Sequence, residues 1–198
     1  MREPVPSSLL ILASTSLFRK ALLTAAAIPF RAVASGVDER APRGVHPKEL
    51  ARILSLKKAQ AVSARYPEAL VVGSDQTAEL DGRLLRKPGS RSAARAQLRA
   101  MSGKTHWLHT GVALARGSPR VRRVALASVK LTLRDLSAEE IDAYLDTGEW
   151  EGCAGSYRIE AQGIKLMEGI KGEHSAIVGL PMVKLIKMLA AEEFPLFQ

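Results

Sequence analysis

Short apolar runs alternate with segments of helical periodicity in the first half of the chain. Leu9 to Ala13 and Ala69 to Gly73 are continuous apolar or small runs bounded by polar residues, which predicts two buried strands. Residues 17–27 and 47–66 carry apolar positions at helical spacing, and the second segment opens on Pro47, as helices often do. Strands that alternate with helices in this way favour an α/β fold.

The second half adds pairs of strands to this pattern. A hairpin turn is predicted at Asp81-Gly82, and no internal repeat or linker interrupts the chain. The further predicted elements are a basic helix over 90–101, strands over 107–115 and 121–133 joined at Gly117-Ser118-Pro119, a helix over 138–147 opened by a capping box at Ser137, a strand over Ile164 to Met167, and a helix over 181–191. We therefore expect a single domain over residues 1–198 with a partly antiparallel, mixed sheet.

Composition indicates the cellular compartment in which the protein works. The chain has 198 residues, 46% of them hydrophobic, and a single cysteine, Cys153. One cysteine excludes an internal disulfide and fits a reducing compartment. The apolar run near the N-terminus is short for a signal peptide, and no stretch approaches the roughly 18 apolar residues of a membrane span. We expect a cytoplasmic protein with no membrane partner.

The positive charge is concentrated in one segment. The net charge is +9, and residues 83–134 hold 13 Lys or Arg and no Asp or Glu. Such a segment indicates a phosphate-rich partner, either nucleic acid or nucleotides, or else a solvated basic face. Aromatic residues that could stack on single strands are nearly absent from it, since Trp107 stands alone, which makes nucleic acid the less favoured partner.

Candidate chemistry follows the second buried run. Asp75 comes two residues after it, and Arg86-Lys87-Pro88 supplies a cationic pair about ten residues later. Ligands gather at the carboxyl ends of strands in open α/β sheets, and a carboxylate near cations suits metal-assisted attack on a phosphate. Ser14 to Ser16, between the first strand and the helix that follows it, form either a phosphate-binding site or only a helix cap.

Short motifs are spread over nearly the whole chain. They are Leu10-Ile11-Leu12-Ala13-Ser14-Thr15-Ser16 with Arg19, Val37-Asp38-Glu39, Lys58-Ala59, Gly73-Ser74-Asp75-Gln76, Lys87-Pro88, Ser102-Gly103-Lys104, Thr110-Gly111-Val112 and Val178-Gly179-Leu180-Pro181. In this order and spacing they resemble one family, the Maf-like nucleoside triphosphate pyrophosphatases. The resemblance implies an elongated α/β fold with a mixed sheet and a cleft between two lobes, related to the inosine triphosphate pyrophosphatases. It also implies a house-cleaning hydrolase that splits nucleoside triphosphates into monophosphate and pyrophosphate with a divalent metal, Mg²⁺, Mn²⁺ or Co²⁺.

Two features resemble the subgroup that prefers 7-methyl-GTP. The subgroup acting on dTTP and UTP has Asp-Thr where this chain has Asp75-Gln76, and the run from Cys153 to Glu160 also matches the 7-methyl-GTP subgroup. We therefore expect a 7-methyl-GTP pyrophosphatase, with a dTTP/UTP pyrophosphatase as the alternative. A nucleic-acid-binding protein and a regulator of cell division that uses the fold as a binding module are the non-catalytic alternatives.

The resemblance assigns roles to nine residues. Asp75 is the expected proton acceptor, and Glu39 is its candidate partner on the metal, although an exposed loop carboxylate remains open for Glu39. The expected phosphate-binding residues are Ser14, Arg19, Lys58 and Lys87, and the expected base-reading residues are Phe18, Gln76 and Glu160. Phe18 replaces a tryptophan of the subgroup and could instead be a core residue. Ala161 replaces a glycine, and the family often forms homodimers.

Overall fold

The computed structural model describes residues 9–42, 44–117 and 120–197. Strands alternate with helices in the first part of the chain, and a section that is richer in strands follows. The elements are β1 (Leu10–Leu12), α1 (Leu17–Ala25), β2 (Arg31–Ala32), α2 (Pro47–Ser63), β3 (Leu70–Leu80), β4 (Arg83–Leu85), α3 (Arg91–Met101), β5 (Thr105–Arg116), β6 (Val121–Leu133), α4 (Ala138–Asp146), the 3-10 helix η1 (Gln162–Leu166), β7 (Met167–Lys171), α5 (His174–Val178) and α6 (Met182–Ala190).

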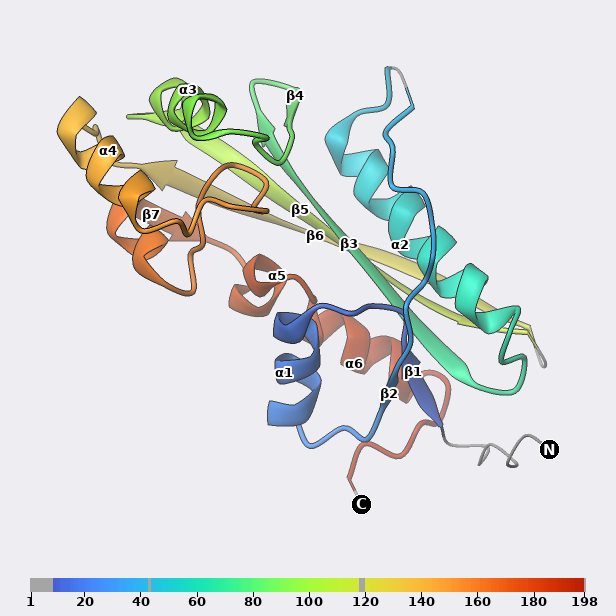
Figure 1. Cartoon of the computed structure of the whole chain (residues 1–198). Coiled ribbons are helices and arrows are strands. Elements are labelled where there is room, and N and C mark those ends of the chain that lie inside the picture. The colour runs from blue at the N-terminus through green and yellow to red at the C-terminus, as the bar shows by residue number, and fades with distance from the viewer. Residues whose placement is uncertain (1–8, 43, 118–119, 198) are drawn as a thin grey trace.

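A seven-stranded mixed sheet runs through the molecule (Figure 1). Its strand order is β2-β1-β3-β5-β6-β7, with β4 paired to β3. β1 is parallel to β2 and β3, whereas β3, β5, β6 and β7 pair antiparallel. The predicted α/β fold with a partly antiparallel sheet is confirmed.

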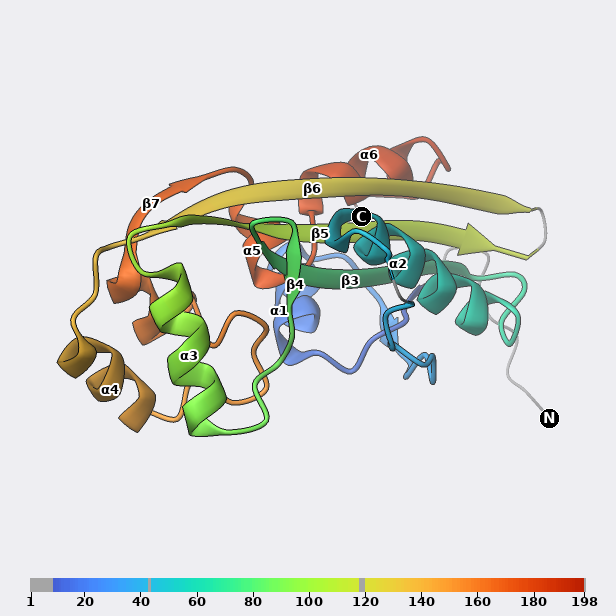
Figure 2. The ribbon, with the colours of Figure 1, turned by 90° about the horizontal axis from the view of Figure 1, so that it is seen from above.

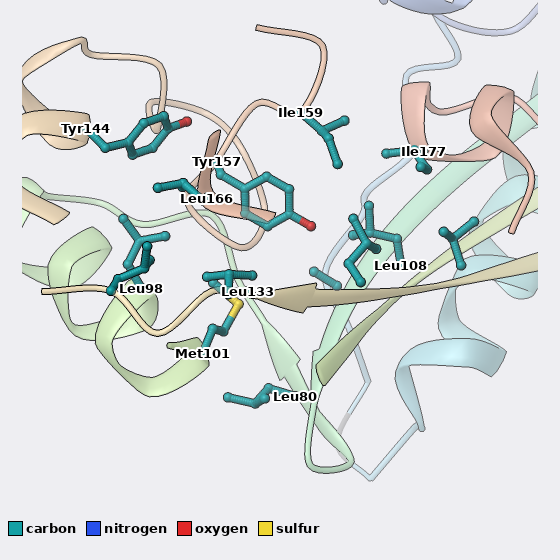
Figure 3. Close-up of a cluster of buried hydrophobic side chains, with 14 of the residues drawn as sticks. Leu80, Leu98, Met101, Leu108, Leu133, Tyr144, Tyr157, Ile159, Leu166 and Ile177 are labelled. Atoms are coloured by element: carbon teal, nitrogen blue, oxygen red, sulfur yellow. The ribbon is translucent and has the colours of Figure 1, made fainter. Parts of the chain in front are cut away.

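Separate clusters of buried hydrophobic residues lie at the two ends of the sheet. Near one end, α3 and α4 cover a cluster that includes Leu98, Tyr144 and Tyr157 (Figure 3). At the other end β1 is buried on both faces, since Leu10 and Leu12 join one cluster while Ile11 joins another. Burial on both faces explains why β1 is a continuous apolar run rather than an alternating one. Figure 2 shows the long strands β3, β5 and β6 connecting the two ends.

Helix α2 lies directly against the sheet because two glycines remove the side chains between them. A Cβ built on Gly73 of β3 would lie 2.1 Å from the backbone oxygen of Ser55, and one on Gly111 of β5 would lie 2.3 Å from that of Ala51. These distances are far below van der Waals contact, so no larger residue fits at either position with α2 in this place. The close approach brings α2 to the part of β3 that carries Asp75.

The structure corrects two details of the expected elements. β3 continues to Leu80, so Asp75 lies inside a long strand and not at its carboxyl end. The strand expected over Ile164 to Met167 is wrong: a 3-10 helix covers Gln162–Leu166, and the strand begins at Met167. The predicted hairpin between β5 and β6 includes Ser118 and Pro119, which lie outside the described residues, while the two strands pair antiparallel as expected.

Candidate active site

A pocket of about 490 Å³ lies between the two ends of the sheet. One wall comes from the β1–α1 turn and the loop at residues 34–39, and the other wall from the loop at residues 152–160. Every residue expected in the site lines this pocket: Ser14, Phe18, Arg19, Glu39, Lys58, Asp75, Gln76, Lys87 and Glu160. Residues spread over almost 150 positions of the sequence are therefore brought together around one cavity.

A buried lysine joins the two carboxylates of the site. Lys58 Nζ lies 2.7 Å from Asp75 Oδ1 and 2.6 Å from Glu39 Oε1. The side chains of Lys58 and Asp75 are 6% and 8% exposed, whereas that of Glu39 is 55% exposed. Asp75 Oδ2 accepts no hydrogen bond from the described residues and is not buried, so this oxygen faces the open pocket.

The carboxylates of Asp75 and Glu39 have opposite pKa shifts. Burial raises the pKa of Asp75 above its usual value, although Lys58 and Arg19 oppose the shift. Burial also disfavours the charge on Glu39, but the hydrogen bond and charge of Lys58, together with the charges of Lys87 and Arg19, lower its pKa overall. Burial therefore strengthens Asp75 as a base relative to an exposed aspartate, whereas the surrounding cations favour the ionised form of Glu39.

Arg19 is held in place by the backbone. Its Nε donates to the carbonyl of Gly179 at 2.8 Å, and its Nη1 lies 3.3 Å from Ser14 Oγ. Burial lowers the pKa of Arg19, and the charges of Asp75 and Glu39 oppose that shift. The guanidinium remains charged at any physiological pH and carries a positive charge to the start of α1, where free backbone N–H groups already favour anions. The Ser16 side chain caps this helix by accepting from the N–H of Arg19.

The amide of Gln76 has one orientation. Its Nε2 donates towards Thr110 Oγ1 and the carbonyls of Ala176 and Ile177, at 2.8 to 3.0 Å. Two carbonyl oxygens around the same atom require it to be the NH₂ group. Gln76 Oε1 accepts no hydrogen bond from the described residues, so Gln76 offers the pocket an acceptor. Thr110 stands in one of the matching motifs but was given no role, and α5 was not predicted from the sequence; both hold the amide of Gln76.

Phe18 and Glu160 lie on opposite walls of the pocket. The Phe18 side chain is 40% exposed, which excludes the core position considered from the sequence. Glu160 is exposed and forms no hydrogen bond with the described residues. Arg158, which the sequence reading did not single out, places its guanidinium carbon 5.7 Å from the centre of the Phe18 ring.

The histidines of β5 lie outside this pocket. His106 Nε2 is hydrogen bonded to Tyr157 Oη at 2.6 Å, and His109 lies between Glu79 and Ser128, at 2.8 Å from each. Within residues 9–42, 44–117 and 120–197, no group of three or more His, Cys, Asp or Glu side chains could hold a metal ion. Any metal in the pocket would therefore take further ligands from substrate and water.

Comparison with known proteins identifies the family of this chain. The family model described as Maf-like protein matches residues 9–192. The chain belongs to this Maf-like family. A protein of Xanthomonas axonopodis pv. citri named 7-methyl-GTP pyrophosphatase is 46% identical, over 93% of this chain and 97% of its own length. A protein of Nitrobacter winogradskyi named nucleoside triphosphate pyrophosphatase is 43% identical, over 92% and 93% of the two chains.

Solved structures extend this Maf-like fold to more distant proteins. The Ham1 protein of Staphylococcus aureus covers 93% of this chain and 99% of its own, with a TM-score of 0.54 and 13% identity. The HAM1 protein of Coxiella burnetii matches with a TM-score of 0.51 and 12% identity. At such identities the likeness concerns the fold alone, and it confirms the elongated α/β architecture expected from the sequence. No helix among the described residues has the length and apolar character needed to cross a membrane.

Proposed function

We propose that this protein is a nucleoside triphosphate pyrophosphatase that hydrolyses 7-methyl-GTP to 7-methyl-GMP and pyrophosphate, and so removes a modified nucleotide from the pool. The observation that carries the proposal is the buried Asp75 carboxylate, which faces a pocket of about 490 Å³ beside the cations of Lys58 and Arg19. Pockets of this size hold small molecules, and this one combines cations for phosphates with a free carboxylate oxygen for water. Relatives with the corresponding printed names support the choice of substrate.

The triphosphate would bind to the cationic side of the pocket. Arg19 offers a guanidinium that grips phosphate oxygens in pairs, and Lys58 and Lys87 add point charges. Ser14 and the N-terminus of α1 add neutral donors. Lys87 is exposed and reaches the pocket from the segment after β4, so it would meet the phosphate chain from the solvent side.

The donor set fits a divalent cation that arrives with the nucleotide. Glu39 and Asp75 both contact the ammonium of Lys58, so their carboxylates converge on one point. Mg²⁺ typically takes one or two carboxylates and fills its other positions with phosphates and waters. Bound there, Mg²⁺, Mn²⁺ or Co²⁺ would neutralise charge on the phosphates and on the leaving pyrophosphate.

Asp75 would act as the base of the reaction. Water attacks the α-phosphorus, the bond to the bridging oxygen breaks, and pyrophosphate leaves with the electron pair. Asp75 Oδ2 faces the pocket and takes the proton of the attacking water. Its raised pKa makes it a stronger base than an exposed aspartate, while Lys58 keeps it ionised.

A second group of side chains around the pocket is suited to a guanine base. Guanine presents ring and exocyclic N–H donors on one edge, and Gln76 Oε1 and the Glu160 carboxylate are both acceptors. Methylation at N7 gives the base a positive charge, which favours the carboxylate of Glu160 and the face of an aromatic ring such as Phe18. Pyrimidines lack this pair of donors, so the acceptors would discriminate against dTTP and UTP.

A nucleotide panel tests the proposal. The protein is assayed for pyrophosphate and orthophosphate release from 7-methyl-GTP, GTP, dTTP, UTP, CTP and ITP with Mg²⁺ or Mn²⁺. We expect pyrophosphate, with the highest kcat/KM for 7-methyl-GTP. The Asp75→Asn variant should bind the nucleotide and lose turnover. Preference for dTTP or UTP would contradict the base-reading roles, and turnover by Asp75→Asn would contradict the mechanism. The single domain, the homodimer and the cytoplasmic location stay predictions.

A further inference from the structure

Arg158 bridges the pocket by lying over Phe18. Phe18 belongs to α1 on one wall, and Arg158 belongs to the loop at residues 152–160 on the other. The guanidinium carbon is 5.7 Å from the ring centre, which is the geometry of a cation–π contact. The backbone of Arg158 is fixed independently of its side chain, because its N–H donates to Tyr144 Oη and its carbonyl accepts from Gly163.

A base cannot enter between these two groups as they stand. Stacked planar groups need about 3.5 Å between layers, so a base between a ring and a guanidinium requires about 7 Å in total. The observed 5.7 Å is too short. A base that stacks on this face of Phe18 must therefore displace the Arg158 head group, which stays close by because its backbone is fixed.

The Arg158 head group carries a charge that no described carboxylate compensates. It forms no ion pair with a described carboxylate, and its Nε is buried without a hydrogen-bond partner in the described chain. Its other side-chain contact is with the thiol of Cys153, where burial raises the pKa and the charge and hydrogen bond of Arg158 oppose that shift. Little is lost when the head group moves aside, since an unpaired buried N–H is itself unfavourable.

We propose that Arg158 is a specificity-determining residue that reduces the preference for 7-methylated over unmethylated guanine. This inference rests on the proposed function. A 7-methylated guanine is cationic, so it competes with Arg158 for the same aromatic face and is repelled by the displaced guanidinium. Unmethylated guanine is neutral and meets no such repulsion. Arg158 therefore acts against the selectivity that Phe18 and Glu160 supply.

The test compares kcat/KM for 7-methyl-GTP with kcat/KM for GTP in the same variant. Both substrates have the same triphosphate, so any effect on phosphate binding cancels in the ratio. Arg158→Met should raise the ratio about two- to fivefold, the size of the repulsion between two exposed unit charges about 4 to 8 Å apart in water. Arg158→Lys keeps the charge and should change the ratio less. Arg99→Met, which removes an exposed charge on α3, is the matched control and should leave the ratio unchanged.

Each result decides between the proposals. An unchanged or lower ratio in Arg158→Met, relative to Arg99→Met, overturns the inference while the proposed function stands. A wild-type protein that turns over neither substrate overturns the proposed function, and this inference with it. Thermal unfolding of each variant shows whether it folds. If Arg158→Met does not, Arg158→Gln removes the same charge and carries the comparison with the same expected rise.

Discussion

Lys58 Nζ lies 2.7 Å from Asp75 Oδ1 in the floor of the pocket, and both side chains are almost fully buried. The two residues come from α2 and β3, which approach closely because Gly73 and Gly111 leave no side chain between helix and sheet. A buried ion pair of this kind contributes little net stability when intact, but removing one partner leaves an uncompensated buried charge. The pair is therefore a sensitive point for both activity and folding.

We expect Lys58→Met to reduce kcat/KM at least about 100-fold and to lower the free energy of unfolding by about 3 kcal/mol, because Asp75 loses its counter-ion in a buried place. Nucleotide assays and urea unfolding at pH 7.5 measure the two effects. Lys57→Met changes an exposed lysine of the same helix and should leave both quantities nearly unchanged. Equal losses in the two variants would show that Lys58 acts only through net charge.

The close approach of α2 gives a second prediction. In Gly73→Ala the new Cβ would lie 2.1 Å from the backbone oxygen of Ser55, so α2 must move away from β3. We expect a loss of about 3 kcal/mol in stability, at the upper end for overpacking, and a large fall in activity as Lys58 separates from Asp75. Gly169→Ala is the control, because a Cβ on this glycine of β7 meets nothing within 4 Å. A stable, fully active Gly73→Ala protein would contradict the proposed link between the glycine and the site.

The nine candidate residues all line one pocket, and their roles there stay predictions. The sequence named them through motifs that resemble a known family. It could not show that β3 continues past Asp75 to Leu80. Residues 74–79 are polar or small, and all of them except the half-buried Gln76 are buried because β5, α2 and α5 surround them.

The sequence could not predict contacts between distant segments, because these too depend on how the elements pack in the folded chain. The carbonyl of Gly179 receives hydrogen bonds from Arg19 and Ser74, although 160 residues separate Gly179 from Arg19. The short α5 was missed because five residues show too little periodicity to indicate a helix. Arg158 was missed since its partner, the Phe18 ring, lies across the pocket in another element.

Base reading gives a third prediction. Gln76 Oε1 is fixed in direction because its Nε2 donates towards three acceptors, whereas Glu160 is exposed and has no such support. We expect Glu160→Ala to lower kcat/KM for 7-methyl-GTP about tenfold, which is the cost of one charge-assisted hydrogen bond, and to change dTTP turnover little. Glu160→Gln should fall between wild type and alanine, since it keeps an acceptor and loses the charge. Parallel losses on guanine and thymine substrates would count against a base-reading role.

The last prediction concerns acid stability and His106. His106 is fully buried, its Nδ1 has no hydrogen-bond partner in the described chain, and burial lowers its pKa to about 4. In the unfolded chain the imidazole titrates near its ordinary value of about 6.5, so the unfolded state binds a proton first as the pH falls. The contribution of His106 to stability is therefore fully present above about pH 7 and is lost progressively towards pH 4, by at most about 3 kcal/mol.

His106→Gln isolates this contribution, because glutamine does not titrate and keeps a group able to hydrogen bond with Tyr157 Oη. We expect the variant to be less stable than wild type at pH 7.5, since glutamine does not fill the imidazole site. Between pH 7.5 and pH 5, urea unfolding should show a smaller loss of stability in the variant than in wild type. The contributions of His46, His109 and His174 cancel in this difference. Equal losses in the two proteins would mean that His106 takes up its proton as readily in the folded state as in the unfolded chain.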